Sequence, residues 1–222
     1  MIRFLPSPLG QRVSILCRNV LLPVLLCSLF TGFLGLPTIA QESQGTRLYW
    51  QPNWTLSWEV FQGPVPVDRP SEVSCAITAG IEWKCGFSLH PIEGEQGIYL
   101  LKVPAERLVS RAYVEPLASW VVGPSDPSLQ YMILIFDIHH VYSLRLRDAL
   151  LATSTRVASP TAADVWLKHI AQLTQDECAR VAAQCEGETA HGTLPTQLAE
   201  WRTQVDEWIE ALTPSSGPDA VD

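Results

Sequence analysis

The stretch SLQYMILIFDIHHVYSLRLRDALL, residues 128–151, constrains the fold of this chain more than any other segment. It is largely apolar and contains neither glycine nor proline, and it is longer than a usual strand of about 3–10 residues. Such a run predicts a long buried helix. Asp137, His139 and His140 lie in its middle. They have two interpretations: a metal or proton-transfer site, or polar residues at the edge of a buried helix.

The segments before this run are rich in aromatic and β-branched residues and predict strands. They cover residues 46–63, 73–89 and 97–114, with Gly80 as an expected bend. Strands that precede helices are typical of the α+β class. We therefore expect an α+β fold with a small antiparallel sheet, followed by the long buried helix and two further helices.

The two further helices are predicted from apolar periodicity after a loop at residues 151–161. The first starts near Thr161, which we expect to cap it, and ends near Ala183, with Trp166, Ile170, Leu173 and Val181 near one face. The second covers residues 196–213 and has apolar residues at spacings of three and four.

Residues 1–40 have the features of a secretory signal peptide. Arg3, Arg12 and Arg18 precede an apolar run, and small residues precede an expected cleavage after Ala40. An uncleaved membrane anchor is the alternative, because the run is long enough to span a bilayer. We expect a single exported domain at residues 41–213, periplasmic or extracellular, and a disordered tail at 214–222.

Cleavage would remove three arginines and no acidic residue, which changes the charge balance. The chain has 15 basic and 23 acidic residues, so 12 basic residues remain and the net charge is 12 − 23 = −11. Such a surface repels phosphates and disfavours nucleic-acid binding. The expected partner is a protein or small molecule of unknown identity, with no membrane association after cleavage.

Four cysteines remain in the exported part, namely Cys75, Cys85, Cys178 and Cys185. An even number in an exported chain predicts two disulfides. Three connectivities are open, and the local one pairs Cys75 with Cys85 and Cys178 with Cys185. The second local pair requires the helix to end before Cys185, because seven helical residues separate two Cα atoms by about 10 Å.

Five short segments resemble, in order, the motifs of a known family. They are LSWEVFQG (56–63), CAITAGIEW (75–83), SW (119–120), FDIHHVYSLRLR (136–147) and ETAHG (188–192). Together they resemble the bacterial domain-of-unknown-function family described as predicted secreted zinc-dependent proteases. The resemblance extends over residues 46–212 and implies a zinc-protease-like scaffold.

The chain departs from this family where the family binds its metal. A His-Glu-x-x-His motif immediately precedes the family's F-D-I, and it supplies two zinc ligands and the base that activates water. Tyr131, Met132 and Ile135 occupy those positions here, and Val60 and His140 replace two further acidic residues of the family pattern. We therefore expect no catalytic residue, no metal and no cofactor, and a binding or structural role for a degenerate relative of these proteases.

The alternative is an active metallohydrolase that binds zinc through relocated ligands. Its ligands would come from His139, His140 and His191, with Asp137 beside them. Adjacent histidines on a helix point about 100° apart, so His139 and His140 cannot both bind one ion without distortion. The alternative therefore requires His191 to lie next to the central helix.

Overall fold

A computed structural model describes residues 47–53 and 55–213. All of them belong to the second of the two units into which the chain divides, residues 43–222. The predicted signal peptide, its cleavage after Ala40 and the predicted tail at 214–222 lie outside the described residues. Within the described part, no helix combines the length and apolar character needed to cross a membrane.

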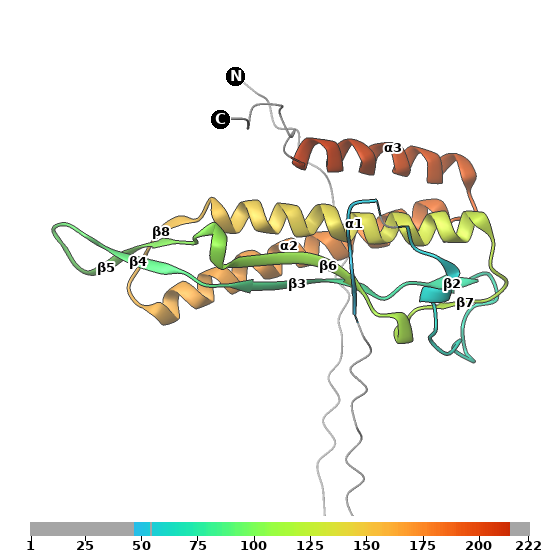
Figure 1. Ribbon diagram of the computed structural model, residues 1–222, viewed down its shortest axis with the longest axis horizontal. Helices are drawn as coiled ribbons and strands as arrows, with labels where there is room; N and C mark the ends of the chain where they lie inside the picture. The colour runs from blue at the N-terminus through green and yellow to red at the C-terminus, as the bar shows by residue number, and fades with distance from the viewer. Residues whose placement is uncertain (1–46, 54, 214–222) are drawn as a thin grey trace, which may run out of the picture. The chain divides into compact units, whose positions relative to one another are not determined.

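The predicted central helix is confirmed as α1, Asp126–Leu151. Its start follows from local chemistry, because the Ser125 side chain accepts a hydrogen bond from the Ser128 amide and Pro127 occupies the first turn. The helix packs against a sheet on one side and against both other helices elsewhere (Figure 1). Being covered on several sides explains why its sequence is apolar around most of its circumference.

The described strands form three small antiparallel sheets, with strand orders β1-β6-β3, β2-β7 and β4-β5-β8. Their bounds are β1 Leu48–Tyr49, β2 Cys75–Ala76, β3 Ala79–Cys85, β4 Ser88–Ile92, β5 Glu95–Lys102, β6 Leu108–Val114, β7 Trp120–Val121 and β8 Ser154–Val157. Single-turn helices connect some of them, at Trp58–Val60, Ala105–Arg107 and Pro116–Ala118. The α+β class is confirmed, with three sheets in place of the one expected.

The strand predictions were wrong in three details. The described residues of the first predicted segment, 47–53 and 55–63, contribute only the two-residue β1 and a single helical turn. Gly80 lies inside β3 and not at a bend. The close approach of Tyr113 explains the glycine, because a Cβ at this position would come within 2.7 Å of the Tyr113 ring. Residues 154–157, expected as loop, form β8, which pairs with β5 far away in sequence.

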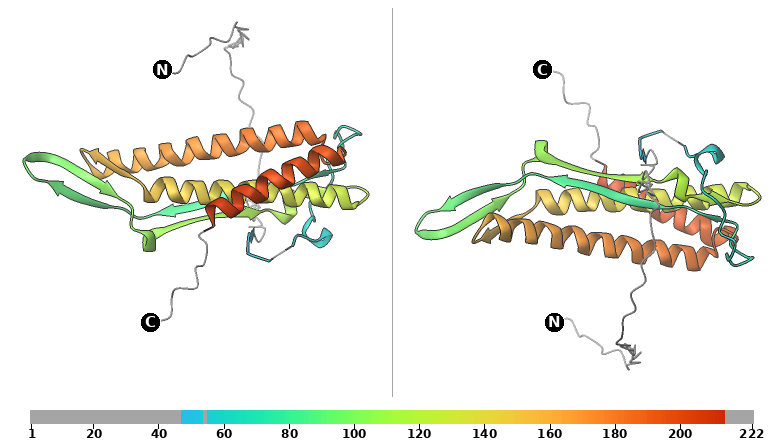
Figure 2. Two further views of the ribbon diagram at one scale, coloured as in Figure 1. Left: turned by 90° about the horizontal axis from the view of Figure 1, so that it is seen from above. Right: turned by 90° about the horizontal axis from the view of Figure 1, so that it is seen from below.

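The two further helices are α2, Pro160–Thr189, and α3, Pro195–Leu212. Ser159, and not Thr161, caps α2, since its side chain accepts a hydrogen bond from the Ala162 amide. The helix also continues beyond the expected end at Ala183. It runs antiparallel beside α1, and α3 lies at an angle to both and contacts both helices (Figure 2).

The buried side chains form two clusters. The larger joins the first half of α1 to the second half of α2, to α3 and to β6, and includes Met132, Leu134, Ile138 and Val205, each 0% exposed. The smaller joins the end of α1 to the start of α2, β5 and β8. The candidate metal-site residues other than His191 lie on the part of α1 that the larger cluster surrounds.

Candidate functional site

The three positions that match the family's metal motif are packed into the larger cluster. Tyr131 is 4% exposed, Met132 0% and Ile135 6%. Burial raises the pKa of the Tyr131 phenol well above its ordinary value, so this group stays neutral at physiological pH. Two of the three side chains carry no metal-binding group suited to zinc, and the third is a neutral phenol held in apolar surroundings.

His139 is held by its own helix. Its Nδ1 lies 2.8 Å from the Ile135 carbonyl oxygen, one turn earlier. Because a carbonyl can only accept, Nδ1 carries the proton and donates it. Burial lowers the pKa of His139 despite this bond, which favours a neutral ring. His139 therefore behaves as a satisfied core histidine on α1.

His140 stacks on Trp50, which follows β1. The ring centroids are 3.4 Å apart and the planes differ by 5°. Burial lowers the pKa of His140 to about 4, so the imidazole is neutral at pH 7. A neutral ring in this position contributes packing to the interface between α1 and the first described segment. This partner could not be predicted from the sequence.

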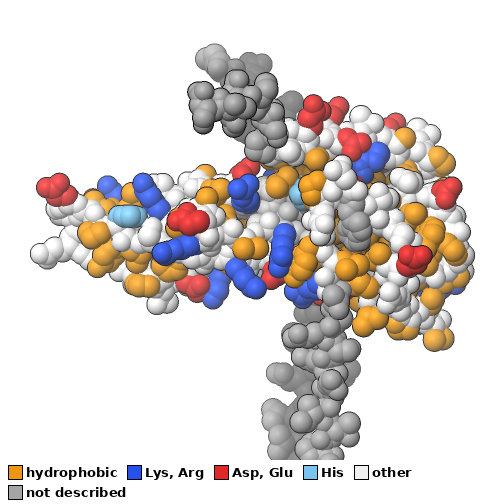
Figure 3. Space-filling view, viewed as in Figure 1, with side chains coloured by type: hydrophobic (Ala, Val, Ile, Leu, Met, Phe, Trp, Pro, Cys, Tyr) orange, Lys and Arg blue, Asp and Glu red, His pale blue; other side chains and the backbone are white. Residues whose placement is uncertain are grey.

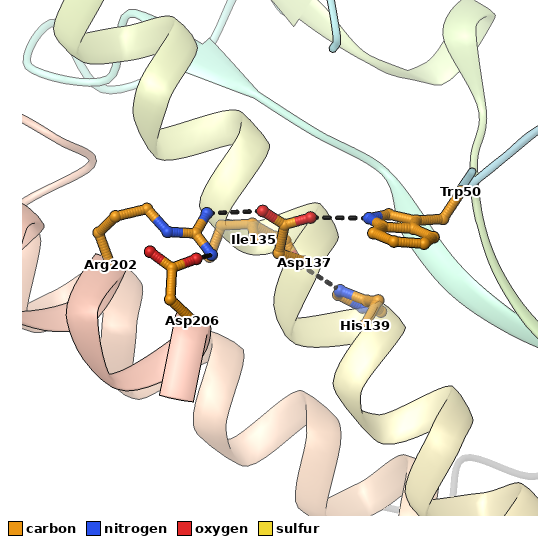
Figure 4. A network of polar contacts seen from close by, with 6 residues as sticks. All are labelled: Trp50, Ile135, Asp137, His139, Arg202 and Asp206. Atoms are coloured by element: carbon orange, nitrogen blue, oxygen red, sulfur yellow. Dashed lines mark hydrogen bonds and ion pairs between the residues drawn. The ribbon is translucent and has the colours of Figure 1, made fainter. Parts of the chain in front are cut away.

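Asp137 joins three parts of the chain (Figure 4). One carboxylate oxygen accepts a hydrogen bond from Trp50 Nε1 at 2.8 Å, and the other accepts from Arg202 Nη1 at 2.6 Å. Arg202 lies on α3 and also pairs with Asp206 at 2.5 Å. Burial acts against the charge of Arg202, but the two carboxylates outweigh it and raise its pKa. Asp137 therefore serves as a structural bridge between Trp50, α1 and α3.

His191 lies in the turn after α2, away from the other two histidines. Three consecutive residues there have left-handed backbone, Ala190 (φ 45°), His191 (φ 56°) and Gly192 (φ 83°). The turn places the His191 ring edge-on to Tyr131, with centroids 6.2 Å apart, and its Nδ1 3.1 Å from Glu186 without the alignment of a hydrogen bond.

The structure does not bring the relocated zinc ligands together. Tyr131, the α1 residue that His191 contacts, precedes His139 by eight residues, or about 12 Å along a helix axis. Zinc–nitrogen bonds of about 2 Å require much closer ligands. Across residues 47–53 and 55–213, no group of three or more His, Cys, Asp or Glu is arranged to hold a metal ion.

The four cysteines within the described residues are free thiols in the structure. The local pairing of Cys178 with Cys185, one of the three open connectivities, does not fit this fold, because α2 continues through both residues and keeps their Cα atoms about 10 Å apart. The pairing of Cys75 with Cys85 is absent too, since Cys75 belongs to the larger cluster and Cys85 packs against the smaller. Burial raises the pKa of Cys178 and Cys185 to about 12, which makes both thiols unreactive.

A groove of about 320 Å³ lies where the first turns of α1 and α3 meet. Its lining is mostly apolar and consists of Asp126, Pro127, Gln130, Leu134, Pro195, Leu198, Ala199 and Arg202. The only cation of this lining, Arg202, already pairs with two carboxylates. Acidic side chains also outnumber basic ones along α3, which carries four carboxylates and one guanidinium (Figure 3). The groove is therefore mostly apolar, and Asp126 is the lining carboxylate that no described cation pairs with.

Trp50, Arg202 and the groove were not predicted from the sequence. An aspartate in the middle of an apolar helix signals that a partner must exist, because a buried charge needs one. The sequence does not say which of several arginines that partner is.

Comparison with protein-family models, with curated proteins and with solved structures finds no match for this chain.

Proposed function

We propose that this protein is an exported, catalytically degenerate relative of secreted zinc-dependent proteases, with a binding or structural role. The observation that carries the proposal is the burial of Tyr131, Met132 and Ile135 in the core. Peptide hydrolysis by zinc needs two imidazoles open to a metal ion and a carboxylate beside its water. Apolar packing at these positions is what a helix adopts when the cavity is filled and not used.

The neighbouring polar residues support the same proposal. Asp137, His139 and His140 each have a structural partner, respectively Arg202 with Trp50, the Ile135 carbonyl, and the Trp50 ring. None of the three projects as a free ligand into the groove between α1 and α3. Their roles are those of groups that hold elements together.

Elemental mass spectrometry of the purified protein, dialysed against trace zinc, tests the proposal. We expect a zinc-to-protein ratio near zero. A ratio near one that is lost on replacing His139 or His140 by alanine would refute the proposal and favour the relocated-ligand hydrolase. Circular dichroism on each variant separates loss of metal from loss of fold.

A restoration variant tests the ancestry part of the proposal. Tyr131→His, Met132→Glu and Ile135→His together rebuild the family motif next to His191. If the scaffold is zinc-protease-like, the folded triple variant should bind about one zinc ion, and adding His191→Ala should weaken that binding. A folded triple variant without zinc would argue against this ancestry.

The binding role is proposed for the groove between α1 and α3. Its volume lies within the range of small-ligand sites, about 300–1,000 Å³. Asp126 lines it without an ion pair among the described residues, so the expected ligand is an apolar group that carries a positive charge. Saturation-transfer NMR with n-hexylamine and with hexanoate tests this directly. We expect transfer to the amine alone, its loss in Ala199→Trp, which fills the groove, and its retention in Thr203→Trp on the same helix.

A further inference from the structure

The outer face of α2 carries apolar side chains that nothing in the described structure covers. Val165 is 62% exposed, Trp166 44% and Leu173 56%. The partly buried Ala162 and the exposed His169 lie on the same face, and we call these five residues the outer seam. In both views of Figure 2, α2 forms an edge of the domain with no described element beyond it. Exposed apolar patches of this kind mark interaction surfaces.

The outer seam has the spacing of a helix-pairing surface. Residues 162, 165, 166, 169 and 173 follow one another at three- and four-residue steps on the side opposite the buried stripe of α2. The sequence pattern alone placed Trp166 and Leu173 on one face with Ile170, which is partly buried, and Val181, which is buried, so the exposure of the first two is a finding of the structure. One turn further, Asp176 and then Arg180 continue the same line and end its apolar part.

A hollow of about 490 Å³ opens beside the first turns of the seam. Its lining includes Ser159, Ala162, Val165, Trp166 and His169. The small Ala162 side chain leaves room there, while the large Leu173 stands at the opposite end of the seam. The first end of the seam is thus hollowed, and the other end carries the exposed Leu173 side chain.

We propose that two copies of this chain associate through their outer seams, with the two α2 helices antiparallel. In this arrangement Leu173 of each copy enters the hollow beside Ala162 of the other, and Trp166 faces the other copy's His169. A two-fold axis makes both ends of the contact identical, as in most homodimers. The hollow of each copy therefore receives the Leu173 side chain of the other copy.

Charge selects the antiparallel direction. The same register places Asp176 of one copy opposite Ser159 of the other, where the amino-terminal end of α2 attracts a carboxylate. A parallel pairing would instead oppose the two Asp176 carboxylates. Asp164 and Lys168, at the margin of the seam, already pair within one helix at 2.7 Å and leave no unbalanced charge there.

The seam is short, so the dimer should be weak. Residues 162–173 extend about 16 Å along the helix, which is less than the contact of a standard, permanent interface. We expect a reversible equilibrium with a dissociation constant on the order of 10 μM. The proposal does not depend on the proposed function, because the seam and the α1–α3 groove share no residue.

Sedimentation equilibrium over protein concentrations from about 1 to 500 μM tests the proposal. The wild-type protein should pass from monomer to dimer, whereas Val165→Glu and Leu173→Glu should stay monomeric throughout. Ala179→Glu introduces the same charge at an exposed position of the same helix outside the seam, and it should dimerise like the wild type. A wild-type protein that stays monomeric, or a Val165→Glu protein that dimerises normally, would overturn the proposal.

Disulfide trapping tests the direction of the helices. The Trp166→Cys and His169→Cys proteins are mixed and oxidised, and the cross-linked peptides are identified by mass spectrometry. Antiparallel seams should link the two different proteins to each other. Cross-links formed mainly within each separate protein, between identical positions, would show parallel seams and refute the proposed register.

Discussion

Mild acid should destabilise this protein through His140. The ring is buried against Trp50 and its pKa is lowered from 6.5 to about 4. As the pH falls below 6.5, the unfolded chain takes up a proton at this residue while the folded chain does not. The stability that this histidine contributes is therefore present above pH 6.5 and is lost progressively down to about pH 4.

The size of the effect follows from the two pKa values. Each unit of difference between the two pKa values is worth about 1.4 kcal/mol of stability. The pKa falls from 6.5 to about 4, so the full loss of unfolding free energy is about 3.4 kcal/mol. At pH 5 the loss is about 2 kcal/mol, and solvent at the exposed edge of the ring reduces it to about 1–2 kcal/mol. The pKa of His139 is also lowered by burial, so this residue adds to the loss in the same direction.

Urea denaturation followed by tryptophan fluorescence, at pH 7 and pH 5, measures the loss. His140→Phe keeps an aromatic ring against Trp50 but cannot take up a proton. The difference in unfolding free energy between the two pH values should be smaller in this variant than in the wild type by about 1–2 kcal/mol. His90→Gln, on an exposed strand position, is the control and should behave like the wild type. An equal loss in wild type and His140→Phe would refute the reasoning.

Three further results are expected from contacts described above. Asp137→Ala should lower the unfolding free energy by about 2–4 kcal/mol in urea denaturation, because it leaves a half-buried guanidinium on α3 without its main partner. Gly192→Ala should cost about 2 kcal/mol or more, since its φ is 83° and a Cβ there would lie 2.5 Å from the Cβ of Tyr131 on α1. Gly94→Ala, with φ 80° and open space around it, should cost about 1 kcal/mol. Peptide mapping without reductant should find no bridge between Cys178 and Cys185; finding one in folded protein would contradict the continuous α2.

The central helix could be predicted from the sequence because the signal is local. An apolar run without glycine or proline has few alternatives to a helix, and α1 starts within a few residues of the expected position. β8 could not be predicted in the same way. It is four residues long, and its stability comes from β5, which precedes it by more than fifty residues. The sequence around Ser154–Val157 does not contain that information.

The end of α2 shows why the local pairing of Cys178 with Cys185 does not fit the fold. Gly187 and the polar residues around it suggested a loop, but the helix continues to Thr189 because Cys185 and Thr189 remain on its buried face. Tertiary packing overrides local propensity there. The partners of Asp137 could not be predicted for a related reason, since they come from opposite ends of the described chain.

The bridge from Trp50 through Asp137 to Arg202 has a consequence for how this protein is made. Its three members lie near the beginning, the middle and the end of the described chain, and the two links extend over 87 and 65 residues. During synthesis, or during export if the chain is exported, the last member arrives after most of the protein has emerged. Until then Asp137 has no cation and the segment around Trp50 has only part of its anchor, so we expect the domain to complete its folding in a late step that begins when α3 is free to dock.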